Sequence, residues 1–159
     1  MDELAKKFLE ALGRELGFVP QATEDGLVPL QFGEQRALLH FQGGDTLVLY
    51  AEIGRPAAPR RMELLAHFMA RNFLMAEAGA AVFSYDVHDN MLGMNMRLDM
   101  HALDAPVFLQ SVDAFLGMAG KNAGLLAKMN ESPASARIGP RGSGEAESAT
   151  GGVGAFVRA

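Results

Sequence analysis

Histidine and carboxylate side chains are the groups in this sequence with the greatest capacity for metal binding or acid–base chemistry. The four histidines are His40, His67, His88 and His101. No two of them have the i, i+4 spacing of helical zinc ligands, and the chain has no cysteine to complete such a site. Asp86, His88 and Asp89 come nearest to a metal-binding set, but Asp89 begins a stretch of ordinary turn formers. The sequence therefore predicts no metal and no other cofactor.

Nucleophilic catalysis is not indicated either. Ser84 and Ser111 lack the Gly-x-Ser-x-Gly context of a nucleophile elbow. Residues 139–144 are rich in glycine, but they lack the Lys-Ser/Thr pair of a phosphate-binding loop. Because no other pattern typical of catalysis is present, we expect a protein that is not an enzyme.

The composition is that of one small, acidic, globular domain. The chain has 159 residues, of which 49% are hydrophobic and 21% charged, enough for a packed core without disulfides. Its net charge is −5, and this excess lies in residues 1–130, because the basic and acidic residues of 131–159 balance. Such a domain is repelled by phosphate backbones, which argues against nucleic acid as a partner. Without cysteine, a signal-peptide pattern or a long apolar run, we expect a cytoplasmic protein with no membrane span.

Hydrophobic periodicity predicts a helix and three strands in the first third of the chain. Residues 2–17 place leucine and phenylalanine at four-residue steps, which is typical of an amphipathic helix. Apolar residues recur at every second position over 28–32, 37–41 and 47–53, which predicts three strands. Pro29 removes a backbone donor from the first strand and so places it at a sheet edge. The last two strands flank Gly43-Gly44-Asp45, a turn typical of a hairpin.

The rest of the chain predicts a second helix, a hairpin, a last helix and a tail. The helix over roughly 60–78 is apolar on two sides, so it needs two packing partners, one of which could be a second subunit. Strands are predicted over 83–87 and 92–100, and a helix with Asp104 as its N-cap over 104–129. Together these elements predict an α+β domain over residues 1–130. Residues 131–159, rich in glycine, serine and alanine, are expected to form a disordered tail.

Apolar surface is the remaining functional signal. The chain has ten methionines, and flexible methionine side chains suit surfaces that accept varied partners. Met94 and Met96 belong to an alternating strand, however, so we expect them to face the core and not a binding surface. Val48 and Tyr50 lie on the strand face opposite Leu47 and are candidates for an exposed binding surface, unless a helix of the same chain covers them.

The order of motifs in the second half of the chain is characteristic. An apolar helical stretch, residues 64–74, contains Asn72 and is followed by Gly79, the hairpin of residues 83–94, and Leu103-Asp104 opening the last helix. This order resembles the CesT/Tir-type family of class I type III secretion chaperones. Asn72 within the apolar helix is the most distinctive element of the resemblance, which covers roughly residues 2–128.

The resemblance implies a homodimeric bacterial chaperone that binds the N-terminal region of a type III secreted effector in extended form. Such a chaperone keeps its effector, the client, soluble and ready for secretion. Carried over by position, the resemblance implies that the dimer contact uses Phe68, Met69 and Phe73. It also implies that client binding uses Phe8, Leu12, Val48 and Tyr50.

Two other interpretations fit the same residues. A regulatory adaptor of the same fold would use the same apolar surfaces to bind a compact partner outside secretion, whereas a chaperone binds an extended, protease-sensitive client. A small-molecule-binding domain would use a pocket between sheet and helix, with Asp86 and His88 beside it. The last interpretation predicts a ligand-dependent rise in melting temperature that is lost in His88→Ala.

Overall fold

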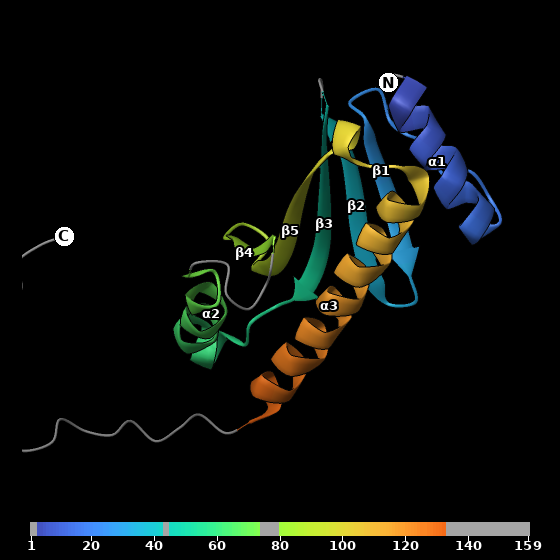
Figure 1. Cartoon of the computed structure of the whole chain (residues 1–159). Coiled ribbons are helices and arrows are strands. Elements are labelled where there is room, and N and C mark those ends of the chain that lie inside the picture. The colour runs from blue at the N-terminus through green and yellow to red at the C-terminus, as the bar shows by residue number, and fades with distance from the viewer. Residues whose placement is uncertain (1–2, 43–44, 74–79, 133–159) are drawn as a thin grey trace, which may run out of the picture.

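The computed structural model describes residues 3–42, 45–73 and 80–132 of the chain. It shows an α+β fold in which α3 crosses one face of an antiparallel sheet, α1 lies beside α3, and α2 lies beside the edge strand β4 (Figure 1). The elements are α1 (Glu3–Leu16), β1 (Leu27–Phe32), β2 (Gln35–Gln42), β3 (Thr46–Gly54), α2 (Arg61–Ala70), β4 (Ala81–Asp86), β5 (Met91–Asp99) and α3 (Ala105–Glu131). The predicted fold class and element order are confirmed.

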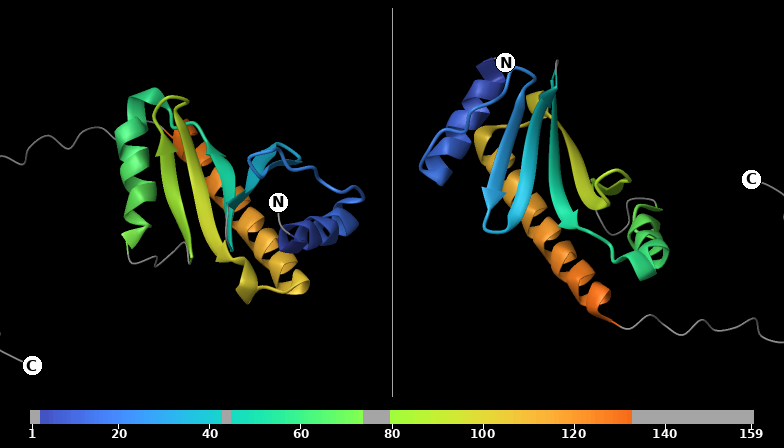
Figure 2. Two further views of the ribbon diagram at one scale, coloured as in Figure 1. Left: turned by 90° about the horizontal axis from the view of Figure 1, so that it is seen from above. Right: turned by 180° about the vertical axis from the view of Figure 1, so that it is seen from behind.

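The five strands form one sheet in the order β1-β2-β3-β5-β4, so β1 and β4 are its edges. The edge position that Pro29 predicts for β1 is therefore confirmed. Alternation along β3 buries Leu47, Leu49, Ala51 and Ile53 under α3 and turns Val48 and Tyr50 to the other face. Both views of Figure 2 show α1 and α3 on one side of the sheet, which leaves its other face open over β1, β2 and β3.

The core lies between this sheet and the helices. The apolar stripe of α3 contributes Phe108, Val112 and Phe115, and Phe8 of α1 stacks on Phe108 with ring centroids 4.7 Å apart. Asp104 accepts a hydrogen bond from the Val107 amide at 2.8 Å, so the predicted N-cap is confirmed. Glycines at three exposed positions weaken the later turns of α3. The helix nevertheless continues to Glu131 because its buried stripe continues to Leu126.

The prediction for the second helix is wrong in its extent. Helix α2 ends at Ala70, and Arg71 and Asn72 form a turn instead of continuing it. The reason is a long-range one: the Asn72 side chain bonds to the backbone of β4, which requires the chain to leave the helix there. Residues 74–79 of the predicted helix, and residues 133–159 of the predicted tail, lie outside the described residues.

Candidate protein-binding surfaces

The Asp86 carboxylate, at the end of β4, stabilises the turn that follows the strand. Asp86 accepts hydrogen bonds from the amides of His88, at 2.8 Å, and Asp89, at 3.4 Å. Within residues 3–42, 45–73 and 80–132, no three His, Asp or Glu side chains are grouped so that they could hold a metal ion. The helices of the same part of the chain include none that is long and apolar enough to cross a bilayer.

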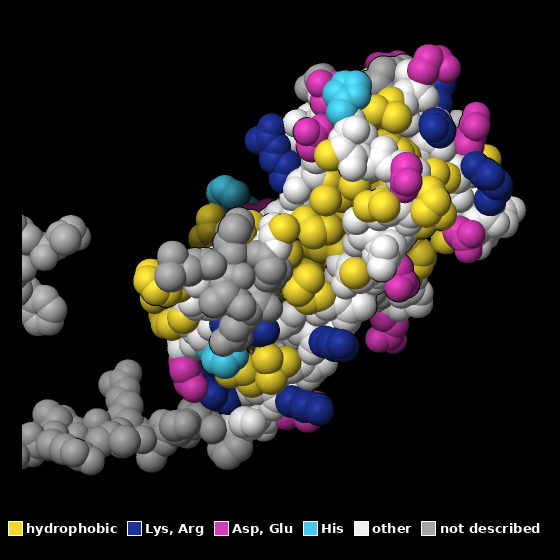
Figure 3. All heavy atoms as spheres, viewed as in Figure 1, with side chains coloured by type: hydrophobic (Ala, Val, Ile, Leu, Met, Phe, Trp, Pro, Cys, Tyr) yellow, Lys and Arg dark blue, Asp and Glu magenta, His cyan; other side chains and the backbone are white. Residues whose placement is uncertain are grey.

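A groove between α1 and α3 has a mostly apolar lining and reaches the core. Its volume is about 360 Å³, and we refer to it as the α1–α3 groove. Its apolar lining consists of Leu12, Leu16, Phe32, Leu109, Val112 and Leu116, and its polar lining of Glu15, Gln110 and Asp113. Figure 3 shows hydrophobic side chains gathered on this side of the molecule, with acidic and basic side chains around them. The groove thus has an apolar floor and a negatively charged rim.

The two predicted client contacts on α1 have different surroundings. Phe8 is fully buried and stacked on Phe108, so its ring holds α1 against α3 and is not on the surface. Leu12, one turn later, is also buried but reaches the floor of the α1–α3 groove. Sequence reasoning missed Leu109 and Leu116, although their seven-residue spacing forms a second apolar row beside the main stripe of α3.

The open face of the sheet contains the other two predicted client contacts, Val48 and Tyr50, both half-buried. The Tyr50 ring lies over Gly93 of β5, where a Cβ atom would be only 2.4 Å from the ring. Gly93 is therefore needed for Tyr50 to pack on its own sheet. Burial raises the pKa of the Tyr50 phenol, and nearby carboxylates, that of Glu52 foremost, raise it further.

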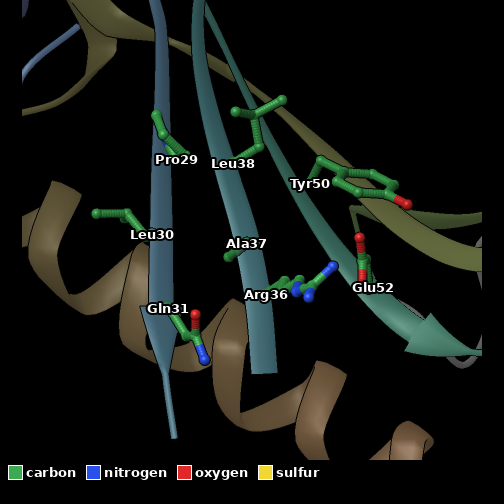
Figure 4. A pocket seen from close by; sticks show the side chains of 8 residues that line it. All are labelled: Pro29, Leu30, Gln31, Arg36, Ala37, Leu38, Tyr50 and Glu52. Atoms are coloured by element: carbon green, nitrogen blue, oxygen red, sulfur yellow. The ribbon is translucent and has the colours of Figure 1, made fainter. Parts of the chain in front are cut away.

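Tyr50 also borders an open cavity of about 580 Å³ on this face. Figure 4 shows the lining side chains from β1, β2 and β3, which are Pro29, Leu30, Gln31, Arg36, Ala37, Leu38, Tyr50 and Glu52. The cavity mixes apolar side chains with one cation and one carboxylate. A larger share of its lining is polar than in the α1–α3 groove.

The backbone of β1 offers few groups to an added strand. The Phe41 amide donates to the Gly26 carbonyl at 2.9 Å, which turns alternate residues from Gly26 toward β2 and turns Leu27, Pro29 and Gln31 outward. The Leu27 amide donates to the Thr23 hydroxyl at 3.1 Å, and its carbonyl accepts from the Thr23 amide at 2.8 Å. Pro29 has no N–H. Strand addition at this edge is therefore restricted to the Pro29 carbonyl and the backbone of Gln31.

The β4 edge is covered by a side chain. Asn72 accepts a hydrogen bond from the Phe83 amide at 2.7 Å and donates one to the Phe83 carbonyl at 2.9 Å. The asparagine side chain thus makes both bonds that a neighbouring strand would make to Phe83. Beside it, Phe68 of α2 packs edge-on against the Phe83 ring, with centroids 5.2 Å apart. The most distinctive residue of the sequence motif therefore blocks the β4 edge at Phe83.

Comparison with known proteins adds to this description. Residues 7–121 match the family model of the Tir chaperone protein (CesT) family. The chain belongs to the CesT family. The resemblance stated from the sequence is confirmed. Among curated proteins, none matches this chain.

Solved structures share the CesT-family fold at low sequence identity. The ExsC–ExsE complex aligns with a TM-score of 0.66 and 17% identity, over 79% of this chain and 97% of that one. The HopA1–SchA chaperone–effector complex aligns with a TM-score of 0.59 and 14% identity, over 81% and 94%. The Yersinia pestis type III secretion chaperone SycH, in complex with a fragment of YscM2, aligns with a TM-score of 0.58 and 15% identity, over 72% and 96%. At these identities the alignments show the fold.

In this CesT-family chain, the predicted dimer contacts on α2 and just after it differ in exposure. Phe68 is fully buried against β4, Met69 is partly buried, and Phe73 is 75% exposed. The structure adds two exposed apolar side chains that sequence reasoning missed, Met62 on α2 and Val87 after β4, at 79% and 70% exposure. A single exposed apolar residue does not contribute to a periodic pattern, so the sequence gives no sign of it.

Arg71 joins α2 to the CesT-family core. Its guanidinium lies 5.2 Å from the centre of the Phe83 ring and 5.8 Å from that of Phe68. It also donates a hydrogen bond of 2.7 Å to the side chain of Asn122, a buried polar residue of α3. Because three elements meet at this one side chain, the position of α2 depends on α3.

The last turns of α3 lie beyond the segment matched by the family model and hold the loop before α2. Asn130 accepts a hydrogen bond from the Ala57 amide at 2.9 Å and donates one to the Arg55 carbonyl at 3.0 Å. Arg60 donates to the carbonyls of Met129 and Ser132 at the helix end. The Arg60 side chain thus caps the C-terminal end of α3, and the Asn130 side chain of α3 binds backbone groups of the loop before α2.

Proposed function

We propose that this chain is a homodimeric type III secretion chaperone of the bacterial cytoplasm. It binds the N-terminal segment of a secreted effector in extended form and keeps that segment soluble and ready for secretion. Membership of the CesT family supports this function, as does the likeness to proteins described as a chaperone–effector complex and a type III secretion chaperone. The observation that carries the proposal is the α1–α3 groove, an apolar floor with an acidic rim.

The groove suits apolar side chains from an extended segment. Its floor combines side chains from α1, β1 and α3, and about 360 Å³ is room for a few side chains, not for a folded domain. Burying one leucine or phenylalanine side chain there contributes about 1.5–3 kcal/mol. The carboxylates of Glu15 and Asp113 at the rim favour basic residues beside those apolar anchors.

Client binding relies on side chains more than on strand addition. The β1 edge presents the Pro29 carbonyl and the Gln31 backbone, so an added strand gains only a short ladder there. The Asn72 side chain occupies the Phe83 backbone groups at the β4 edge. A client strand would have to displace that side chain. We therefore place the client along the α1–α3 groove, with Leu12 on its floor, and any strand pairing at the Pro29 carbonyl and the Gln31 backbone. Val48 and Tyr50 on the open face remain proposed as further contacts.

The homodimer contact is proposed on the outer surface of α2. The contact surface consists of the exposed Met62 and the partly exposed Met69 of α2, together with the exposed Phe73 just after the helix. Phe68 supports that surface from inside by packing on Phe83. The two proposed surfaces lie at different ends of the molecule (Figure 1). A dimer formed through α2 therefore leaves the α1–α3 groove of each protomer accessible.

Paired substitutions on one helix test the client groove. Leu109→Gln places an amide in the groove floor, and Val107→Gln makes the same kind of change at a 44% exposed position outside it. Titration calorimetry with the N-terminal segment of an effector recovered from the native cells measures the effect. Leu109→Gln should weaken binding about tenfold, since about 1.4 kcal/mol of apolar burial is lost, and Val107→Gln should not.

The same complex distinguishes a chaperone from an adaptor. Limited proteolysis should cut the bound partner on either side of a protected, extended N-terminal stretch. A partner that stays compact and resistant throughout would support the adaptor. Equal loss of affinity in Leu109→Gln and Val107→Gln would contradict the groove as the binding site.

A further inference from the structure

The α1–α3 groove has two properties that specify a ligand. Its floor is apolar, with Leu109, Val112 and Leu116 along one side. Its charged lining residues, Glu15 and Asp113, are both acidic and both exposed. A matching segment therefore combines bulky apolar side chains with an adjacent basic one.

Residues 153–159 of the same chain have this combination. They contain Val153, Phe156 and Val157, followed directly by Arg158. Phe156 is the single aromatic residue in the sequence of 133–159, which is otherwise rich in glycine, alanine and serine and also contains Arg137 and Arg141. Apolar side chains and a cation thus occur together near the far end of a polar stretch.

The chain between Ser132 and residue 153 is long enough for residues 153–159 to reach the α1–α3 groove. The described part of the chain ends at Ser132, about 20 residues and so roughly 30 Å along α3 from Val112 in the groove. A glycine- and serine-rich linker of about 20 residues has a root-mean-square span of about 25 Å. Effective concentration is greatest when a linker's span matches the distance between its two sites.

We propose that residues 153–159 dock in the α1–α3 groove of their own molecule, with Phe156 on the apolar floor and Arg158 beside Glu15 and Asp113. The segment is an internal competitor that covers the groove until a client displaces it. Docking itself is independent of the proposed function, whereas competition with a client rests on it.

The expected size of the competition follows from the linkage. A segment tethered at this range has an effective concentration of about 1 mM. With an intrinsic dissociation constant of about 0.1 mM it occupies the groove in about nine molecules of ten, and it raises a client's apparent dissociation constant about tenfold. Phe156→Ser should therefore tighten client binding about tenfold.

A spin label on the full chain tests docking directly. The sequence has no cysteine, so Gly152→Cys provides one attachment site for a nitroxide. Docking predicts that the methyl signals of Leu109, Val112 and Leu116 lose most intensity. An undocked tail would broaden Leu125 most, because Leu125 lies much nearer Ser132 along α3. That pattern would overturn the proposal.

Matched variants separate specific docking from general proximity. Phe156→Ser and Arg158→Glu should each restore the groove signals, and Ile138→Ser, the same loss of an apolar side chain elsewhere in the tail, should not. Arg158→Glu combined with Asp113→Lys should restore docking through the exchanged charges. If Phe156→Ser leaves the broadening unchanged, the segment does not dock through its aromatic ring and the proposal fails.

Two further outcomes keep this inference distinct from the proposed function. Mixing spin-labelled chain with separately isotope-labelled chain reveals docking between molecules. Broadening in the mixed sample at the strength expected for docking between molecules alone would overturn docking within one molecule. Addition of the effector segment then tests competition. Loss of broadening supports both proposals, and retained broadening with a bound client contradicts the groove as the client site. If the client binds at the groove but the chain shows no broadening before the client is added, only the docking of residues 153–159 is contradicted.

Discussion

The two edges of the sheet are closed in different ways, and their neighbourhoods differ accordingly. At the β4 edge, Asn72 bonds to both backbone groups of Phe83, and α2 packs beside it. At the β1 edge, Thr23 pairs with Leu27 and Pro29 lacks a donor, so closure is local, and the adjacent α1–α3 groove stays open. Closed edges limit unwanted strand pairing. The comparison suggests that this fold keeps its backbone protected and offers side-chain surface for binding.

The largest expected effect separates a buried phenylalanine of α2 from an exposed one just after the helix. Phe68→Ala should lower the free energy of unfolding by about 3–5 kcal/mol, because it empties a fully buried site against Phe83. Phe73→Ala, at a 75% exposed position, should change it by less than about 0.5 kcal/mol. Urea unfolding measures both. Phe73→Ala should instead weaken self-association in sedimentation velocity, and an unchanged dimer in that variant would contradict the proposed interface.

The next effect tests the closure of the β4 edge. Asn72→Ala removes two hydrogen bonds from the Phe83 backbone and should cost about 2–3 kcal/mol of stability. Asn95→Ala is the control, since it removes one bond, to the Ser84 hydroxyl, on the open face, and should cost about 1 kcal/mol. Chemical denaturation compares the two, and exchange of the Phe83 amide should speed up in Asn72→Ala alone. Equal destabilisation by both variants would show that the edge contact has no special role.

A smaller effect is expected at the β1 edge. Thr23→Val keeps the side-chain shape but loses the acceptor of the Leu27 amide, which should cost about 1 kcal/mol. Thr46→Val loses only a bond accepted from the long Arg97 side chain, which can turn to water, and should cost less than about 0.5 kcal/mol. Thermal unfolding gives both values. A larger loss in Thr46→Val than in Thr23→Val would contradict the local closure of this edge.

The smallest effect concerns the open face and alkaline pH. The pKa of Tyr50 is raised in the folded state, so folding favours the protonated phenol, and its contribution is lost as pH rises through that folded pKa. Tyr50→Phe should therefore flatten the decline of melting temperature above about pH 10, the ordinary pKa of tyrosine. Tyr85→Phe, which loses a hydrogen bond to Asn90, serves as the control. A steeper decline in Tyr50→Phe would contradict the burial of Tyr50 against its sheet.

Periodicity in the sequence was sufficient to predict the strands and helices, because each buries one face and alternation or four-residue spacing records that face. Pro29 and Asp104 were informative because their chemistry acts locally. The end of α2 was missed because the partner of Asn72 is on β4, far along the chain. Local propensity contains no information on such a contact.

The candidate site was predicted less completely than the fold. The pattern of α1 correctly identifies Phe8 and Leu12 as one apolar face, but it cannot show that α3 covers Phe8. The α1–α3 groove exists only where α1, the end of β1 and α3 converge, so Leu16, Phe32 and Leu109 have no common sequence signal. Phe68 and Phe73 likewise look equivalent in sequence, and only packing against β4 distinguishes them.

Methyl NMR of the full chain, titrated with its effector's N-terminal segment, tests the central claim most directly. Binding in the α1–α3 groove predicts the largest shifts at Leu12, Leu109 and Leu116, with a small change at Val82 on β4. The largest shifts at Val82 and its β4 neighbours, with the groove methyls unchanged, would contradict the account and place the client at the edge closed by Asn72.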